Sequence, residues 1–243
     1  FSEATKNRSL EDAILAAARE GGIRIIGPNC LGVIYAGDAG AGINTFFIPE
    51  EKFKVNLSGR KNVAILSQSG AMGIMELYNL RNAISPKVVV SYGNQLDVDP
   101  SDLVHYFQDD PNVDVIGLYI EGFKKAAGRK FFNVTSKSRK PIVVYKAGRT
   151  EAGMMAARSH TASIAGEYEV ARAAMKQAGL VVAPSMIEHG DLVKTFALLC
   201  GFPVNGCRTA VIANAGYEKT SAADNLGDLV LAEIGRASCR ERV

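Results

Sequence analysis

The sequence predicts an α/β protein built around a doubly wound parallel sheet. Short apolar runs typical of strands alternate with amphipathic helical patterns between residues 62 and 183. The run at 113–120 is apolar at almost every position, as in parallel strands that helices cover on both faces. Because no second hairpin signal interrupts the alternation, we expect one parallel sheet with helices on either side.

Each expected element has a local signal. Ser9 with Asp12 makes a capping-box-like start, and the helical pattern that follows ends at Gly21-Gly22. Residues 36–60 are expected to be connecting and edge structure. The expected strands are 23–26, 62–66, 87–91, 113–120, 141–145, 180–182 and 208–213. The expected helices are 10–19, 70–80, 100–108, 124–138, 166–178, 187–199 and 219–226, with a linker at 201–206.

Composition restricts the class of protein. The chain has 243 residues, enough for more than one compact domain. A net charge of +3 without a dense basic block gives no footprint for nucleic acid. No apolar run reaches the roughly 20 residues of a membrane helix, and no signal-peptide pattern is seen, so we expect a cytoplasmic protein without membrane contact. The four cysteines, at positions 30, 200, 207 and 239, lack CxxC spacing and nearby histidines, which favours reduced thiols over zinc or disulfides.

Ser67-Gln68-Ser69-Gly70 follows an expected strand and opens an expected helix. Backbone N–H groups and hydroxyls there can converge on an anion at the positive end of the helix dipole, which favours a phosphate. An ordinary N-cap formed by Ser69 alone is the competing interpretation.

His160 lies in the segment 148–166, which is rich in Ser, Thr, Ala and Gly. We interpret this segment as a loop whose small residues let a ligand or a second protein surface approach a reactive imidazole. A histidine that only makes local hydrogen bonds is the alternative. His105 and His189, the other histidines, receive no role.

Two other positions follow expected strands. Glu121 comes directly after 113–120, so its carboxylate is expected at the carboxyl edge of the sheet, although an exposed strand-end glutamate would look the same. Gly27-Pro28-Asn29-Cys30 follows 23–26, where open α/β sheets bind ligands. Simple turn chemistry explains its first three residues almost as well.

Several stretches, in order over about residues 1–232, resemble one family. They are Gly27-Pro28-Asn29-Cys30-Leu31-Gly32, Ser67-Gln68-Ser69-Gly70-Ala71-Met72-Gly73, 91–99, Tyr119-Ile120-Glu121-Gly122, 146–153 and the segment around His160. The sequence resembles the alpha part of the nucleoside-diphosphate-forming acyl-CoA synthetases, the ADP-forming acetate-CoA ligase branch of the succinyl-CoA synthetase superfamily. A related branch of protein acetyltransferases lacks the histidine, so His160 favours the synthetases.

The resemblance implies a reversible ligase reaction. Acyl-CoA, phosphate and ADP give a carboxylic acid, CoA and ATP through an acyl phosphate and a phosphohistidine. It implies catalytic roles for His160 and Glu121. The phosphate-binding residues would be Ser67, Gln68, Ser69 and Gly70, and the residues near CoA and the acyl group would be Asn29, Cys30, Gly93 and Asn94. Nucleotide and Mg would bind to an ATP-grasp beta domain or subunit, with no metal on this chain, and the full-length enzyme is expected to be oligomeric.

The resemblance also implies the domain organisation. Residues 1–50 would be the remnant of a Rossmann-like CoA-binding domain and 51–186 a flavodoxin-like CoA-ligase domain. A helix and linker at 187–206 would lead to the start of a second flavodoxin-like domain at 207–232, where Tyr217-Glu218-Lys219 replaces the Gly-Pro-Gly of the family. Residues 233–243 break the pattern and are interpreted as a non-native tail, such as translated adapter sequence. We therefore expect a fragment that is inactive alone.

Two other classes compete with the synthetase interpretation. A non-catalytic acyl-CoA-binding or regulatory module could keep the same fold, and labelling of His160 would separate the two. A nicotinamide-dependent Rossmann enzyme is disfavoured because no GxGxxG follows a strand with an acidic residue about 20 positions later. The sequence leaves open the acyl group, the nucleotide base and the physiological direction.

Overall fold

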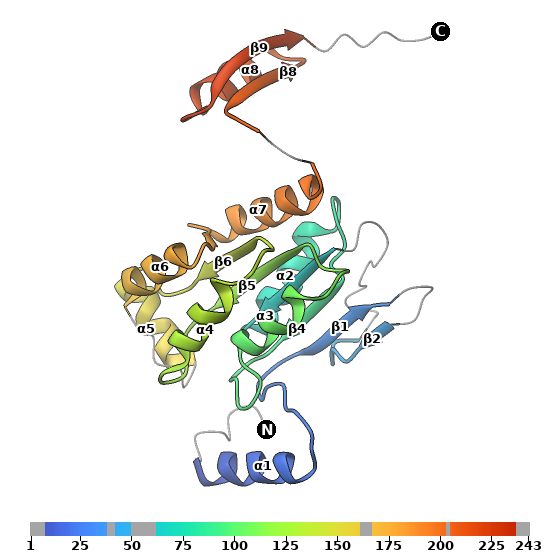
Figure 1. Ribbon diagram of the computed structural model, residues 1–243, viewed down its shortest axis with the longest axis vertical. Helices are drawn as coiled ribbons and strands as arrows, with labels where there is room; N and C mark the ends of the chain where they lie inside the picture. Colours follow the sequence, from blue (N-terminus) through green and yellow to red (C-terminus); the bar gives the residue numbers. More distant parts are fainter. Residues whose placement is uncertain (1–7, 38–41, 50–61, 161–166, 203–204, 237–243) are drawn as a thin grey trace. The chain divides into compact units, whose positions relative to one another are not determined.

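The computed structural model describes residues 8–37, 42–49, 62–160, 167–202 and 205–236, and the chain divides into two compact units, residues 1–200 and 201–243 (Figure 1). The first unit is an α/β layered structure that holds nearly all of the expected elements. The second is a short strand-helix-strand unit. Each is described by itself below.

One sheet of seven strands runs through the first unit. Its order is β2 (Gly42–Asn44), β1 (Gly32–Ala36), β4 (Val88–Ser91), β3 (Val63–Ser67), β5 (Val115–Ile120), β6 (Ile142–Lys146) and β7 (Val181–Val182). The five strands from β4 to β7 are mutually parallel, whereas β1 is antiparallel to both of its neighbours. The parallel part has the flavodoxin-like order, so the predicted doubly wound sheet is confirmed.

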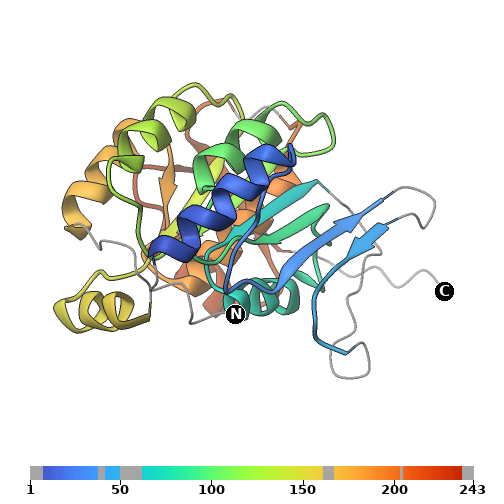
Figure 2. The same cartoon turned by 90° about the horizontal axis from the view of Figure 1, so that it is seen from below.

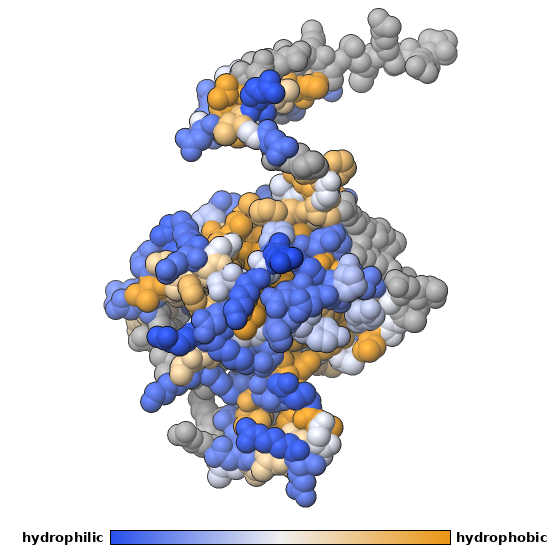
Figure 3. All heavy atoms as spheres, in the orientation of Figure 1, coloured by the Kyte–Doolittle hydropathy of each residue, from blue (hydrophilic) through white to orange (hydrophobic). Residues whose placement is uncertain are grey.

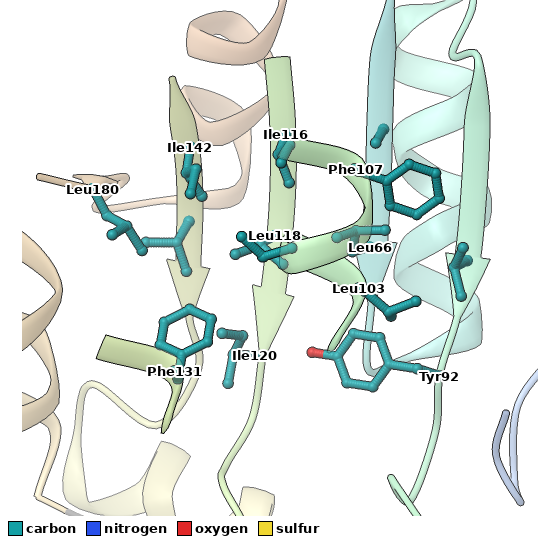
Figure 4. Close-up of a cluster of buried hydrophobic side chains, with 14 of the residues drawn as sticks. Leu66, Tyr92, Leu103, Phe107, Ile116, Leu118, Ile120, Phe131, Ile142 and Leu180 are labelled. Atoms are coloured by element: carbon teal, nitrogen blue, oxygen red, sulfur yellow. The ribbon is translucent and has the colours of Figure 1, made fainter. Parts of the chain in front are cut away.

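Helices cover both faces of this sheet because its strands are apolar on both faces. In β3, Ala64 and Leu66 face one core cluster, while Val63 and Ile65 face the other. The first cluster is closed by α3 (Pro100–Gln108), α4 (Ala127–Thr135) and α6 (Tyr168–Gln177), and Figure 4 shows its side chains between sheet and helices. The second is closed by α2 (Gly70–Leu80) and α7 (Met186–Leu199). Burying these side chains contributes roughly 25 cal/mol per Å² of apolar surface removed from water.

The N-terminal part differs from expectation. Helix α1 (Arg8–Glu20) forms as expected, but residues 23–26 are not a strand, so that prediction is wrong. Instead the carbonyls of Gly27 and Ile25 accept hydrogen bonds from the backbone N–H groups of Leu96 and Val98. The strand of this region is β1, which pairs with β4. Strands β1 and β2 therefore extend the central sheet.

The C-terminal unit contains β8 (Arg208–Ala213), α8 (Gly216–Asp224) and β9 (Val230–Arg236). The two strands are parallel. Strand β9 runs to Arg236, so it includes residues 233–236 of the segment that was interpreted as a non-native tail. Apolar side chains remain exposed in this unit, with Ile212 72% and Tyr217 75% accessible. This is the surface expected of a small sheet with few strands.

The outer surface over α3 and α4 is mostly hydrophilic (Figure 3). Three lysines and arginines of α4 and its flanks, Lys125, Arg129 and Lys130, are exposed there. Across the part of the chain that the structure describes, the helices are too short or too polar to span a lipid bilayer.

Candidate functional site

The candidate site lies where the carboxyl ends of β3 and β5 meet. These strands are parallel neighbours, and β3 continues into α2 on one face while β5 leads to α4 on the other. Such a switch point leaves a crevice at the carboxyl edge of an open α/β sheet, where ligands bind. Ser67 ends β3 and Glu121 follows β5, so both predicted residues reach this edge.

Gln68 joins the two strand ends. Its backbone N–H donates to the carbonyl of Tyr119 at 3.1 Å. Its side-chain Oε1 accepts from the backbone N–H groups of Glu121, at 2.9 Å, and Gly122, at 3.2 Å. The Gln68 side chain is buried, and its hydrogen bonds to the backbone fix the position of Glu121.

Ser69 is the N-cap of α2. It has extended backbone geometry, and its Oγ accepts from the backbone N–H of Met72 at 3.5 Å. The buried hydroxyl of Ser67 donates to the Ser69 carbonyl at 2.5 Å. A Cβ atom at Gly70 would lie 2.5 Å from Cγ of Leu31, so glycine lets the first turn of α2 approach that segment. The remaining N–H groups of this turn form the positive end of the helix dipole, which favours an anion.

Glu121 is half-buried and held by its neighbours. The Tyr119 hydroxyl donates to Glu121 Oε1 at 3.3 Å, and the Tyr119 ring stacks on Tyr145 with centroids 5.9 Å apart. Burial and the nearby carboxylate raise the pKa of Tyr119, so its hydroxyl keeps its proton as a donor. The Nζ of Lys146 donates to the Glu121 carbonyl at 2.7 Å. These contacts fix both the backbone and the carboxylate of Glu121.

Lys146 ends β6 and was not singled out from the sequence. Its side chain is 3% exposed, and Nζ also donates to the carbonyl of Ala147 at 2.6 Å. Burial lowers the pKa of Lys146 to about 8, against the opposing effect of Glu121. A lysine that ends an otherwise apolar strand, one place before a small-residue segment, was the sequence signal that could have identified it.

These residues border a cavity of about 450 Å³, called here the Glu121 cavity. It is lined by Ser69, Ala71, Met72, Met75, Tyr119, Glu121, Tyr145, Ala147, Gly148, Gly153, Ala156 and Met186. Ser67 and Gln68 are absent from the lining, because their polar groups bond within the two loops. Ser69, Glu121 and the segment after β6 thus share one cavity.

The segment after β6 is helical where a loop was expected. Helix α5 spans Glu151–His160, so the loop interpretation is wrong for these ten residues. Alanine, methionine, arginine and glutamate are strong helix formers, and this propensity outweighs the small size of the side chains. The helix follows Gly148, whose φ of +84° favours glycine, and Thr150 Oγ1 accepts from the Gly153 N–H at 3.1 Å.

His160 is the last residue of α5, four positions after Ala156, which lines the Glu121 cavity. The His160 side chain and residues 161–166 lie outside the described part of the structure. Its expected proximity to Ser67, Ser69 and Gly70 therefore stays a prediction, although both segments start from the same edge of the parallel sheet.

A second cavity of about 760 Å³, called here the Cys30 cavity, adjoins the first turn of α2. Its lining is mainly apolar and comes from Ile14, Ile25, Ile26, Pro28, Asn29, Cys30, Leu31, Phe47, Gly70, Ala71, Ile74 and Leu96. Helix α1, which supplies Ile14, lies across the front of this edge in Figure 2. Ala71 lines both cavities, so they meet at the N-terminus of α2.

Of the four residues expected near CoA and the acyl group, Asn29 and Cys30 line the Cys30 cavity, and Gly93 and Asn94 lie against the Pro28-Asn29 segment. Asn29 Nδ2 donates to Asn94 Oδ1 at 3.4 Å, and the Asn94 N–H donates to the carbonyl of Pro28 at 2.9 Å. At Gly93, with φ +53°, a Cβ atom would lie 2.2 Å from that carbonyl oxygen. Burial raises the pKa of the Cys30 thiol, which keeps it protonated.

The two other histidines differ sharply. His105 is exposed, and its Nδ1 lies 3.1 Å from Nε2 of the Gln108 side chain. His189 of α7 is fully buried. Its Nδ1 lies 3.0 Å from Oε1 of Glu76 in α2, and its Nε2 lies 3.3 Å from the Val143 carbonyl. Sequence reasoning missed this pair, because no local pattern links positions 113 residues apart.

Over the described ranges, no three His, Cys, Asp or Glu side chains gather closely enough to hold a metal ion. The polar groups of the site instead suit an anion and an acyl group. Backbone amides and a hydroxyl stand at the α2 N-terminus, next to a largely apolar cavity.

The chain is similar to known ligases along most of its length. It is 39% identical over 232 residues to an ADP-forming acetate-CoA ligase of Methanocaldococcus jannaschii, covering 94% of this chain and 31% of that relative. It is 37% identical over 220 residues to the alpha subunit of ADP-forming acetate-CoA ligase II of Pyrococcus furiosus, covering 89% of this chain and 45% of that subunit. The chain thus spans less than half the length of these relatives.

A solved structure agrees with the sequence matches. The dinucleotide-forming acetyl-coenzyme A synthetase 1 of Ca. Korarchaeum cryptofilum, in complex with phosphate and ADP, superposes with a TM-score of 0.80 at 40% identity, covering 94% of this chain and 47% of that one. The family model of the succinyl-CoA ligase like flavodoxin domain matches residues 60–196, which contain β3 to β7 and the Glu121 cavity. On its fold, its switch-point site and this match, the chain belongs to the succinyl-CoA ligase-like flavodoxin domain family.

Proposed function

We propose that this chain is part of the alpha portion of an ADP-forming acyl-CoA synthetase. The observation that carries the proposal is the meeting of two cavities at the N-terminus of α2. One is large and mainly apolar, and the other holds the Glu121 carboxylate beside the helix that ends at His160. An acyl thioester and a phosphate could therefore react across Gly70 and Ala71.

The proposed chemistry has two steps on this chain. A phosphate oxygen attacks the thioester carbonyl, the C–S bond breaks, and the CoA thiolate leaves with an acyl phosphate formed. A nitrogen of His160 then attacks phosphorus, the P–O bond to the acyl group breaks, and the carboxylate leaves. The phosphoryl group on His160 passes to ADP and gives ATP. Phosphoryl transfer depends mainly on positioning and charge stabilisation, which the helix N-terminus supplies.

The residues of the site would divide these tasks. Glu121 would accept a hydrogen bond from one imidazole nitrogen of His160 and leave the other with a free lone pair for attack. Ser69 and Gly70 would bind phosphate through the first turn of α2, while Ser67 and Gln68 would shape that turn from within. Asn29, Cys30, Gly93 and Asn94 would border the acyl group and the CoA sulfur, as the sequence motifs imply.

The remaining parts of the reaction belong to a partner. The Pyrococcus furiosus relative is named as an alpha subunit, which supports a second subunit or fused domain that would bind ADP and Mg. We propose an ATP-grasp beta domain in that role, and a cytoplasmic, oligomeric enzyme. The identity of the acyl group stays open, because the mainly apolar lining of the Cys30 cavity gives no chemical preference among acyl groups.

A non-catalytic acyl-CoA-binding module on the same fold is the alternative. It would use the Cys30 cavity alone and would not need Glu121, whose carboxylate Tyr119 holds and whose backbone Gln68 and Lys146 hold at the other cavity. The fixed setting of Glu121 favours the enzyme.

Turnover by the full-length enzyme with its nucleotide-binding partner tests the proposal. ATP formation from acetyl-CoA, phosphate and ADP should disappear in His160→Asn and persist in His105→Asn, a matched change at an exposed histidine. ATP formation by His160→Asn at the wild-type rate would exclude the phosphohistidine route.

A further inference from the structure

The Glu121 cavity has a charge problem if phosphate enters it. Among the described residues that line it, Glu121 is the one with an acidic side chain, and no Lys, Arg or His is among them. A carboxylate repels a phosphate dianion, and the low dielectric of a half-buried site strengthens the repulsion. The dipole of α2 offsets part of this, with about half a positive charge at its N-terminus. A positive charge close to Glu121 would offset this repulsion further.

Lys146 is the cation that stands behind this cavity. It has 3% of its side chain exposed and lies directly before Ala147 and Gly148, which line the cavity. A Cβ atom on Gly148 would be 3.9 Å from Nζ of Lys146. Its Nζ donates to two backbone carbonyl oxygens, those of Glu121 and Ala147. A buried ammonium group with this setting costs desolvation free energy, which indicates that its charge serves the site.

We propose that Lys146 is a positioning residue for the phosphoryl group. Its hydrogen bonds to the residues that follow β5 and β6 hold the Glu121 and Gly148 segments at a fixed separation. Its positive charge offsets the Glu121 carboxylate, so that the cavity accepts a phosphate dianion. This inference rests on the proposed function, and names the group that makes the site electrostatically suited to phosphate.

Lys140 provides a comparison within the same part of the fold. It precedes β6, at the opposite edge of the sheet, and its Nζ also donates to two backbone carbonyls, those of Phe107 and Asp110. Both lysines therefore join two loops, and burial lowers the pKa of both. The two lysines differ in position, because Lys146 lies at the carboxyl edge of the sheet and Lys140 at the opposite edge. If Lys146 had a purely structural role, replacing either lysine would have the same effect on phosphate binding.

The charge on Lys146 gives the inference a pH signature. Its pKa of about 8 means that the cation is present below that pH and lost as the pH rises through it. Glu121 is the ionisable group that acts on it, and the raised pKa of Tyr119 keeps that neighbour neutral. A bound dianion raises the pKa of Lys146, and by linkage phosphate affinity falls above about pH 8.

The experiment measures binding of inorganic phosphate to the full-length enzyme by calorimetry, at about pH 7 and about pH 9.5. Wild type should bind phosphate roughly tenfold more tightly than Lys146→Met at the lower pH, the factor that corresponds to one unit of pKa. The ratio should approach one at the higher pH, where the wild-type lysine is neutral. Taking the ratio removes the titration of phosphate itself, which all variants share.

Two further variants separate charge from structure. Lys146→Arg keeps its charge over this range, so its affinity relative to Lys146→Met should persist at the higher pH. Lys140→Met should bind phosphate like wild type at both values. If the arginine variant does not fold, the pH dependence of the ratio of wild type to Lys146→Met still decides.

Equal phosphate affinity of wild type and Lys146→Met at about pH 7, or a ratio that does not change with pH, would overturn the inference. Failure of the proposed function would look different. In that case His160→Asn would retain turnover, whatever Lys146 does to phosphate binding.

Discussion

At the scale of single residues, Glu121 is the best-held group of the site. Its N–H bonds to Gln68, its carbonyl to Lys146 and its carboxylate to the Tyr119 hydroxyl. A carboxylate fixed in this way can select the tautomer of an approaching imidazole, because only one ring nitrogen can donate to it.

Glu121→Gln should lower the equilibrium level of phosphoenzyme in the full-length protein. The amide offers no charged acceptor to the imidazole, and losing a charged hydrogen bond costs about 1.5 to 3 kcal/mol, or roughly one to two decades. Retention of ³²P after rapid gel filtration measures this. Glu169→Gln, at an exposed glutamate of α6, is the matched control and should label like wild type.

The buried pair of Glu76 and His189 supports stability. It joins α2 to α7, and both side chains are fully buried. His189→Ala would leave Glu76 buried without this partner, and leaving a buried polar group unsatisfied costs about 1 to 3 kcal/mol. Urea unfolding should detect the loss, whereas His105→Ala should change the free energy of unfolding by less than about 0.5 kcal/mol. A similar small change in both variants would show that the pair contributes little.

At the scale of elements, the first turn of α2 carries the site. Gly70 brings this turn against Leu31, and so brings the helix N-terminus between the two cavities. The close approach joins segments that are far apart in the sequence, and it is possible because Gly70 has no side chain.

Gly70→Ala should displace α2 from Leu31. The added methyl would lie within 2.5 Å of the Leu31 side chain, and overpacking of this kind costs about 1 to 3 kcal/mol. Differential scanning calorimetry should show the loss, and adding Leu31→Ala should recover part of it. Gly216→Ala is the control, because that glycine also opens a helix but has no atom within 4 Å of the new methyl. Equal destabilisation by the two alanines would contradict this packing argument.

The elements with strong local signals could be predicted from the sequence. Helices α2 and α3 start and end where expected, since Ser69 and Asp99 cap them and Pro100 opens the second. Strand β1 was missed because a five-residue segment that begins with glycine gives little periodic signal. Helix α5 was missed because its small residues were taken as signs of a loop.

The site could be predicted in part for the same reason. Strand-end logic identified Glu121 and the turn of Ser69 and Gly70, because the carboxyl ends of parallel strands share one edge. The roles of Gln68 and Lys146 depend on backbone partners 53 and 25 residues away, respectively. Such contacts form only when the sheet is assembled, so no local pattern reveals them.

At the scale of the whole molecule, the two units differ in their cores. The first contains two clusters of buried side chains on either side of its sheet. In the second, none of the residues 205–230 is fully buried, and β8 alternates between exposed and half-buried positions. Stability should therefore be concentrated in residues 62–200.

Amide hydrogen exchange on the full chain should separate the two units. The N–H groups of β3 and β5 should exchange only through global unfolding, while those of β8 should exchange through local opening, several orders of magnitude faster. Mass spectrometry of peptic fragments measures both strands in one sample. Equal protection of β3 and β8 would contradict the lower stability of the C-terminal unit.

The most direct test of the account is the chemistry of the phosphoryl group on His160. The full-length enzyme, incubated with its nucleotide-binding partner and ATP labelled in the γ-phosphate, should gain a label that acid removes and base does not, as a phosphoramidate behaves. His160→Asn should carry no label and keep the wild-type melting temperature, and His105→Asn should be labelled normally. A label that survives acid, or one that persists in His160→Asn, would contradict the central claim that His160 is the residue phosphorylated at the carboxyl edge of this sheet.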